Sequence, residues 1–132
     1  MTEQEKREYA NKNPLALASL GDAVMTLFMR DNIVKNHDIK VDRIHKEVAK
    51  VVNAKQQSIF YDLIYDCLDE VEADIARRAI NKKVNTIPKS ATLAEYKKAT
   101  ALEAIIGYLY LVKNLERIQE LIQQAMIRGM TL

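Results

Sequence analysis

The sequence predicts an all-α protein of few, long helices, organised as one domain over residues 1–132. Three observations lead to this prediction. Only three glycines and two prolines occur, too few turn residues for a fold of many short strands. Hydrophobic residues make up 48% of the chain, enough to build a core. These residues recur at helical spacing along most of the chain.

The first long helix is predicted over residues 14–35. Asn13 is a good N-cap and Pro14 a good first helical residue. The stretch "NHDIKVD" then interrupts the apolar pattern. A second long helix is predicted from about Val41 to Ile64, followed by a turn near 67–69.

The second half of the chain predicts three further helices. In segment 69–83 acidic residues lead and basic residues trail, the favourable order for a helix dipole. The stretch "NKKVNTIPKSAT", residues 81–92, has no apolar period and predicts a loop. A helix from about 93 to 113 follows. Asn114 can cap a last helix over 115–128, and Gly129 stands where a helix C-cap belongs.

Two apolar helices each carry one solitary acid near a glycine. Asp22 is the only charged side chain in the apolar part of the first helix, and it follows Gly21. Glu103 is the only charge between 99 and 112, with Gly107 one turn further on. A glycine inside a helix costs about 1 kcal/mol relative to alanine, and close approach of another backbone is the usual reason. We therefore expect the two helices to cross closely, with Asp22 facing Glu103.

Two facing carboxylates in apolar surroundings would repel each other, and burial would add to the cost. Three arrangements relieve this: the acids share a proton, pair with a base or hold a cation. Oxygen ligands of this kind suit Mg²⁺. The alternative is that each acid lies on the exposed face of its helix or pairs with a lysine elsewhere. The composition alone leaves both interpretations open.

Positive charge is concentrated in residues 75–98. This segment holds seven basic residues and one acid, a net charge of +6 in a chain whose total is +2. Such a patch on a loop favours phosphates, although a solvated helix end and loop is the alternative for a charge run. The candidate contacts to phosphate and ribose are Arg77, Arg78, Lys82, Lys83, Asn85, Thr86 and Lys89.

A carboxylate pair that binds a metal, beside a patch that binds phosphate, indicates phosphodiester chemistry. The cation would polarise a phosphoryl oxygen and generate hydroxide from water.

The same residues carry a resemblance to a known family. "LGDAV" at 20–24 resembles the ribonuclease III signature, and "LEAIIGYLYL" at 102–111 resembles that family's second acidic helix, about 80 residues later in the chain. The stretch "INKKVNTIPKSATLAEYKKATALEAIIGY" is similar to Mini-ribonuclease III, the short bacterial subgroup. We expect no double-stranded-RNA-binding domain after the last helix.

The resemblance implies an all-α endonuclease domain that acts as a homodimer. It implies Mg²⁺-dependent cleavage of double-stranded RNA, with Mn²⁺ as a substitute ion, and for the Mini subgroup maturation of large-subunit ribosomal RNA. Asp22 and Glu103 carry over as the catalytic and metal-binding acids. Longer members carry further acids at positions that are Leu15, Ala18 and Thr100 here, so the resemblance implies a reduced set.

The chain predicts a cytoplasmic protein without a membrane partner. Its single Cys67 suits a reducing compartment, its charged N-terminus is neither a secretory signal nor a transit peptide, and no run of 18 apolar residues occurs.

Two alternatives to the enzyme are a non-catalytic RNA-binding module with the same fold and a helical interaction protein without RNA. The presence of both acids argues against the first, and the basic segment argues against the second.

Overall fold

The structure is a computed structural model that describes residues 1–131, and within this range it contains seven α-helices and no strand. The helices are α1 (Glu3–Ala10), α2 (Pro14–Asn36), α3 (Val41–Val51), α4 (Ala54–Ile64), α5 (Glu70–Ile80), α6 (Leu93–Leu111) and α7 (Leu115–Ile127), and a short 3₁₀ helix η1 (Tyr65–Cys67) follows α4. The all-α prediction is confirmed. The predicted domain also includes Leu132, which lies outside the described residues.

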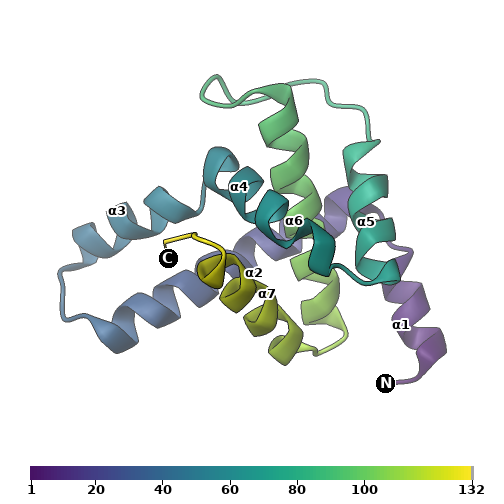
Figure 1. Cartoon of the computed structure of the whole chain (residues 1–132), viewed down its shortest axis with the longest axis horizontal. Coiled ribbons are helices and arrows are strands. Elements are labelled where there is room, and N and C mark those ends of the chain that lie inside the picture. Colours follow the sequence, from purple (N-terminus) through teal and green to yellow (C-terminus); the bar gives the residue numbers. More distant parts are fainter. Residues whose placement is uncertain (132) are drawn as a thin grey trace.

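Helix α6 is the centre of the fold (Figure 1). Every residue between Ala99 and Leu109 is buried except Glu103. A helix that is apolar on all sides must be surrounded by other elements, and α2, α4 and α5 all pack against α6. The main hydrophobic core therefore lies around this helix, and Glu103 is the polar exception within it.

Helices α2 and α6 cross with their backbones in contact. A Cβ atom placed on Gly21 would overlap the carbonyl oxygen of Glu103 and lie 2.9 Å from the amide nitrogen of Gly107. A Cβ atom on Gly107 would overlap the carbonyl oxygen of Leu17. Any side chain at either position would force the helices apart, which explains the two glycines in apolar helices. The predicted close crossing is confirmed.

The prediction of one helix from Val41 to Ile64 is wrong. Helix α3 ends at Val51, and α4 begins at Ala54. Between them Asn53 has an extended backbone, and its side chain accepts a hydrogen bond from the backbone N–H of Gln56 at 3.0 Å. This N-cap starts a new helix, and the apolar periodicity that continues on both sides gave no sign of the break.

The other helix ends agree with the predicted caps. Asn13 and Asn114 each accept a hydrogen bond from the backbone of the helix that follows, at 2.9 Å and 3.2 Å. Gly129 follows α7 with a φ of 114°, a conformation that favours glycine. Helix α1 at the N-terminus was not predicted; it has no buried residue and begins at a capping box between Thr2 and Glu5.

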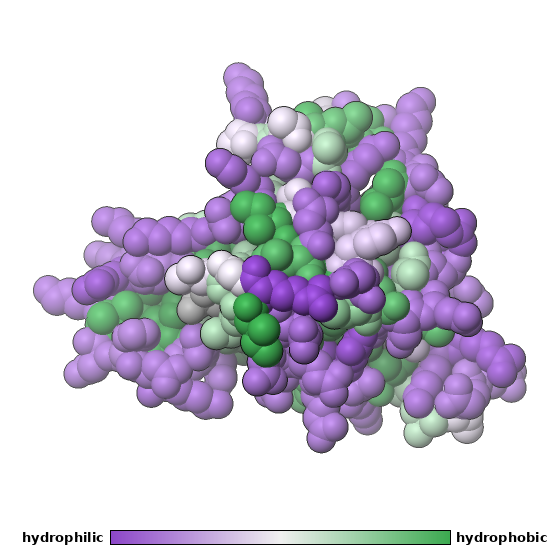
Figure 2. Space-filling model, in the orientation of Figure 1, coloured by the Kyte–Doolittle hydropathy of each residue, from purple (hydrophilic) through white to green (hydrophobic). Residues whose placement is uncertain are grey.

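Two exposed features extend from the fold in different directions. The loop 81–92 stands beyond the start of α6, whereas α3 and the C-terminal half of α2 extend away from the core (Figure 1). Figure 2 shows a face that is mostly hydrophilic, with apolar side chains gathered over α4 and α7. Within residues 1–131, none of the helices combines the length and the apolar character required to cross a membrane.

Candidate active site

The two solitary acids line one cleft. It has a volume of about 380 Å³ and is formed by α2, α4, α6 and the loop 81–92. Asp22 enters it from α2 as an exposed side chain, and Glu103 enters it from α6 as a partly buried one. Because Gly21 packs directly on the carbonyl of Glu103, the glycine crossing is what brings the two carboxyl groups together.

The electrostatics of Glu103 show how close the two acids are. The pKa of Glu103 is raised from 4.5 to about 8. Burial is the largest cause, followed by the negative charge of Asp22 and a hydrogen bond between the two carboxyl groups. A hydrogen bond from Gln57 acts in the opposite direction and lowers this pKa. Without a metal, the pair therefore keeps one proton at neutral pH.

No basic side chain compensates the acid pair. Within the described residues, neither Asp22 nor Glu103 forms an ion pair with a lysine, arginine or histidine. Of the arrangements open to two facing carboxylates, pairing with a base is therefore excluded for this part of the chain. Proton sharing and cation binding remain. The two are mutually exclusive at one carboxylate, because a bound cation would displace the shared proton.

The oxygen atoms in the cleft fit Mg²⁺. This ion prefers oxygen ligands and is commonly held by one or two carboxylates together with water and substrate phosphates. Asp22 and Glu103 supply two carboxylates, and a cation between them would relieve the repulsion that raises the pKa of Glu103. No group of three or more His, Cys, Asp or Glu residues that could hold a metal occurs in residues 1–131. Water and a substrate phosphate would therefore have to supply the remaining ligands of an ion held by Asp22 and Glu103.

Three of the neutral residues that line this cleft, the acid cleft, stand at positions of interest. Leu15, Ala18 and Thr100 all line it, and these are the positions at which the resemblance implies acids in longer relatives. The Thr100 hydroxyl donates a hydrogen bond to the carbonyl of Tyr96 at 2.9 Å. All three replaced positions therefore lie in the acid cleft. The cleft carries less negative charge here than the resemblance implies for longer relatives.

Gln57 is a further residue of the site that was not predicted from the sequence. This residue of α4 lines the acid cleft, yet only 4% of its surface is exposed. A signal was present, because Gln57 stands three residues before Phe60 and four before Tyr61, on the apolar face of a predicted helix. A polar residue at such a position requires a partner inside the protein.

The loop 81–92 carries the exposed part of the predicted basic patch. The residues Lys82, Lys83, Asn85, Thr86 and Lys89 are all exposed. None of these lysines is in an ion pair with another residue of the described chain. Pro88 of the same loop lines the acid cleft. The loop therefore borders the cleft at Pro88, and its exposed lysines lie on the same segment, which stands beyond the start of α6 in Figure 1.

The two predicted arginines differ from the loop lysines. Arg77 and Arg78 both form ion pairs with Asp74. Arg78 also donates hydrogen bonds to the backbone carbonyls of Ala10 and Lys12, which ties α5 to the segment between α1 and α2. Arg78 therefore has a role in the fold, whereas the side chain of Arg77 is 66% exposed and remains at the surface.

Comparison with known proteins identifies the family. The sequence profile described as the ribonuclease III domain matches residues 15–114, which include both acids and the loop. The chain belongs to the ribonuclease III family. The resemblance seen in "LGDAV" and "LEAIIGYLYL" is therefore confirmed.

The similar members of the ribonuclease III family include short bacterial proteins. A Mini-ribonuclease 3 of Thermoanaerobacter sp. is 44% identical over 111 residues, 84% of this chain and 78% of that protein. A Mini-ribonuclease 3-like protein of Fusobacterium nucleatum is 43% identical over 116 residues, 88% of this chain and 87% of that protein. A crystal structure of a Fusobacterium nucleatum protein superposes with a TM-score of 0.81 at 40% identity, covering 91% of this chain and 96% of that one.

Proposed function

We propose that this protein is a Mg²⁺-dependent endoribonuclease that cleaves double-stranded RNA in the acid cleft. Membership of the ribonuclease III family supports ribonuclease activity. The observation that carries the metal dependence is the pair of facing carboxylates, Asp22 and Glu103, which no basic residue of the described chain compensates. The two uncompensated acids suit a divalent cation, and the cationic loop beside them suits the phosphates of a nucleic acid.

Asp22 and Glu103 would hold the metal from α2 and α6. When bound, Mg²⁺ polarises a phosphoryl oxygen and lowers the pKa of water, the two effects that phosphodiester hydrolysis requires. Glu103 must release its proton when the ion binds, because the ion ligates the carboxylate form. Mn²⁺, which also favours oxygen ligands, should serve as a substitute.

The loop 81–92 would hold the RNA. Lys82, Lys83 and Lys89 are exposed and suit phosphate contacts, and Asn85 and Thr86 beside them suit the ribose 2′-hydroxyl. Arg77 can contact a further phosphate from the end of α5, and Arg78 would support the same surface through its bonds to the backbone. Following the resemblance to the Mini subgroup, the proposed substrate is a precursor of large-subunit ribosomal RNA in the cytoplasm.

We also propose that the active form is a homodimer. Cutting both strands of a duplex requires two cleavage sites in a fixed relation, and a two-fold dimer supplies them. We expect light scattering to give twice the mass of one chain, 15.1 kDa, at working concentrations. A monomer under the conditions in which both strands are cut would contradict this prediction.

One experiment tests the proposed activity against its alternatives. Purified protein is incubated with a structured RNA duplex in the presence of Mg²⁺ or of EDTA, and both cleavage and retention of the RNA are measured. Cleavage only with Mg²⁺ is the expected result. Retention without cleavage under either condition would instead identify a non-catalytic RNA-binding module, and neither retention nor cleavage would identify a helical protein without an RNA role.

A further inference from the structure

A buried glutamine stands beside the acid pair. Gln57 is 4% exposed, although glutamine is mostly found at the surface of proteins. Burying an amide costs free energy unless its polar atoms are hydrogen-bonded, and an apolar side chain of similar size would avoid that cost. The position also lies on the buried face of α4, which packs on the central helix α6. Packing therefore does not explain an amide here.

The partners of the Gln57 amide lie on two different helices. Its Nε2 atom donates to the sulfur of Met25 on α2, at a distance of 3.8 Å. A thioether is a weak acceptor, so this contact orients the amide more than it stabilises it. The Glu103 carboxyl on α6 lines the same cleft as Gln57, and the amide is placed to donate toward it, which lowers the pKa of Glu103. The amide is thus held between the two helices that carry the acids.

The neutral charge of the amide suits this position. Once the shared proton has left and before a cation is bound, the charge of Asp22 would push the Glu103 carboxylate away, and the glutamate side chain has the rotatable bonds to follow. A lysine or arginine at position 57 would hold Glu103, but it would also neutralise the charge and compete with a metal ion. A glutamine holds the carboxylate by hydrogen bonding and leaves its charge available.

We propose that Gln57 is a positioning residue that keeps the Glu103 carboxylate directed toward Asp22, ready to bind a divalent cation, with Met25 orienting the amide from the opposite side. The proposal rests on the proposed function in assuming that the acid pair binds a metal. It adds that the arrangement is prepared in advance by a third residue that does not itself ligate the ion.

The first test compares two neighbouring glutamines. Gln57→Met removes the donor and keeps the length of the side chain, and Gln56→Met makes the same change at a half-buried position outside the acid cleft. Mn²⁺ affinity is measured by electron paramagnetic resonance without RNA. Residues that orient a metal ligand typically contribute 10- to 100-fold to affinity, so we expect Gln57→Met to weaken Mn²⁺ binding about 10-fold or more. The Gln56→Met control should bind as the wild type does.

Folding is checked by thermal melting of both variants. Both variants should give one cooperative melt, and Gln57→Met should melt slightly below the wild type, because the partly buried Glu103 carboxyl loses a hydrogen-bond donor while the cost of burying the amide is removed. A folded Gln57→Met variant with unchanged Mn²⁺ affinity would overturn the proposal, since a merely structural glutamine would behave in that way.

A second test needs no metal. In the metal-free protein, the side-chain NH₂ resonances of Gln57 are followed by nuclear magnetic resonance. Removing the acceptor by Glu103→Leu should shift them, and the matched change Glu116→Leu at an exposed site on α7 should not. Resonances that stay in place in the Glu103 variant would contradict the proposed contact. If the wild type bound no Mn²⁺ at all, the proposed metal dependence would fail, and this measurement would still decide whether Gln57 holds Glu103.

Discussion

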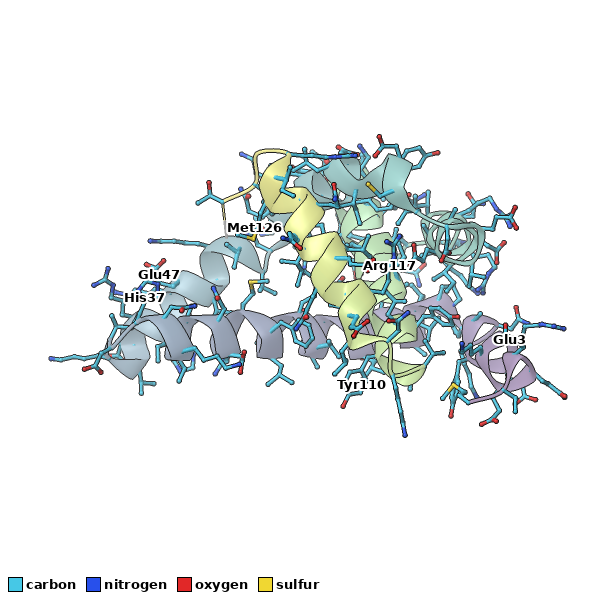
Figure 3. The ribbon with its side chains drawn as sticks, turned by 60° about the horizontal axis from the view of Figure 1, so that its bottom comes forward. Glu3, His37, Glu47, Tyr110, Arg117 and Met126 are labelled. Atoms are coloured by element: carbon cyan, nitrogen blue, oxygen red, sulfur yellow. The ribbon has the colours of Figure 1, made fainter. Side chains whose placement is uncertain are left out.

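Two buried or partly buried glutamates of this protein have opposite surroundings. Glu72 on α5 is 1% exposed, and its carboxylate accepts hydrogen bonds from Arg117 Nε and Nη2 at 2.9 and 2.8 Å and from the backbone of Asp69 at 3.0 Å. Figure 3 shows Arg117 on α7. Glu103 on α6 has no such partner and instead faces a second acid, Asp22.

The difference separates a structural carboxylate from a functional one. The Glu72 carboxylate is compensated by a cation, and the Arg117 guanidinium also donates to the carbonyl of Cys67, so this cluster joins α5, α7 and η1. Breaking such a pair leaves an isolated buried charge. The acid pair is uncompensated and costs stability until a cation arrives, which is the pattern expected of a site that binds one. The predictions below test this contrast, in decreasing order of the effect we expect.

Replacing either member of the acid pair should abolish cleavage and keep the fold. In Asp22→Asn or Glu103→Gln, one of the two charged oxygen ligands is lost, and we expect the single-turnover rate of RNA cleavage in Mg²⁺ to fall by several orders of magnitude. Melting temperatures in EDTA should not fall, because each change removes repulsion. Wild-type rates in either variant would show that the metal lies elsewhere.

Replacing Arg117 should lower stability and leave the cleavage activity of the folded protein unchanged. The variant Arg117→Met leaves the Glu72 carboxylate buried without its cation, and we expect the free energy of unfolding to fall by about 3–5 kcal/mol. Urea denaturation measures this loss. The rate of cleavage per folded molecule should be unchanged, since the pair does not line the acid cleft. A double variant that also carries Glu72→Leu should recover much of the stability, and failure to do so would mean that Arg117 acts through other contacts.

The stability of the metal-free protein should decrease as pH rises. The pKa of Glu103 is about 8 in the folded protein, whereas its ordinary value is 4.5. Between these values the folded state binds more protons than the unfolded state, so the free energy of unfolding falls as pH increases through this window. Urea denaturation in EDTA at a series of pH values measures the slope. Glu103→Gln should flatten it and stabilise the protein at the alkaline end; an equal slope in that variant would assign the effect to another group.

The loop lysines should affect RNA affinity and leave the chemical step nearly unchanged. Replacing Lys82, Lys83 and Lys89 together by alanine should weaken RNA binding and flatten its salt dependence, by a log–log slope of roughly 0.7 to 0.9 per lost contact. Binding is measured in EDTA over a range of salt concentrations. The control Lys46→Ala removes an exposed lysine from α3, outside the acid cleft and the loop. A triple variant with unchanged affinity and slope would place the RNA on another surface.

Most of the secondary structure and the two acids were predictable from the chain alone. The caps at Asn13 and Asn114 and Gly129 are local signals that agree with the structure. Apolar periodicity located the predicted helices, with the exception of the break within 41–64. The glycines Gly21 and Gly107 even predicted a tertiary contact, because a glycine in an apolar helix has few other uses. The break at Asn53 was missed because periodicity carries no information about a cap that interrupts it.

The pairing of polar groups, in contrast, depends on how distant helices pack. Glu72 and Arg117 are 45 residues apart in the chain, and Gln57 and Met25 are 32 apart, so no local pattern links them. The same holds for Arg78, which looked like a free cation in the sequence and is bonded to the backbone 66 and 68 residues away. Helical periodicity tells which face of a helix is buried, but the packing of distant helices chooses the partner. A compensated acid and an uncompensated one are therefore distinguished only in the folded chain.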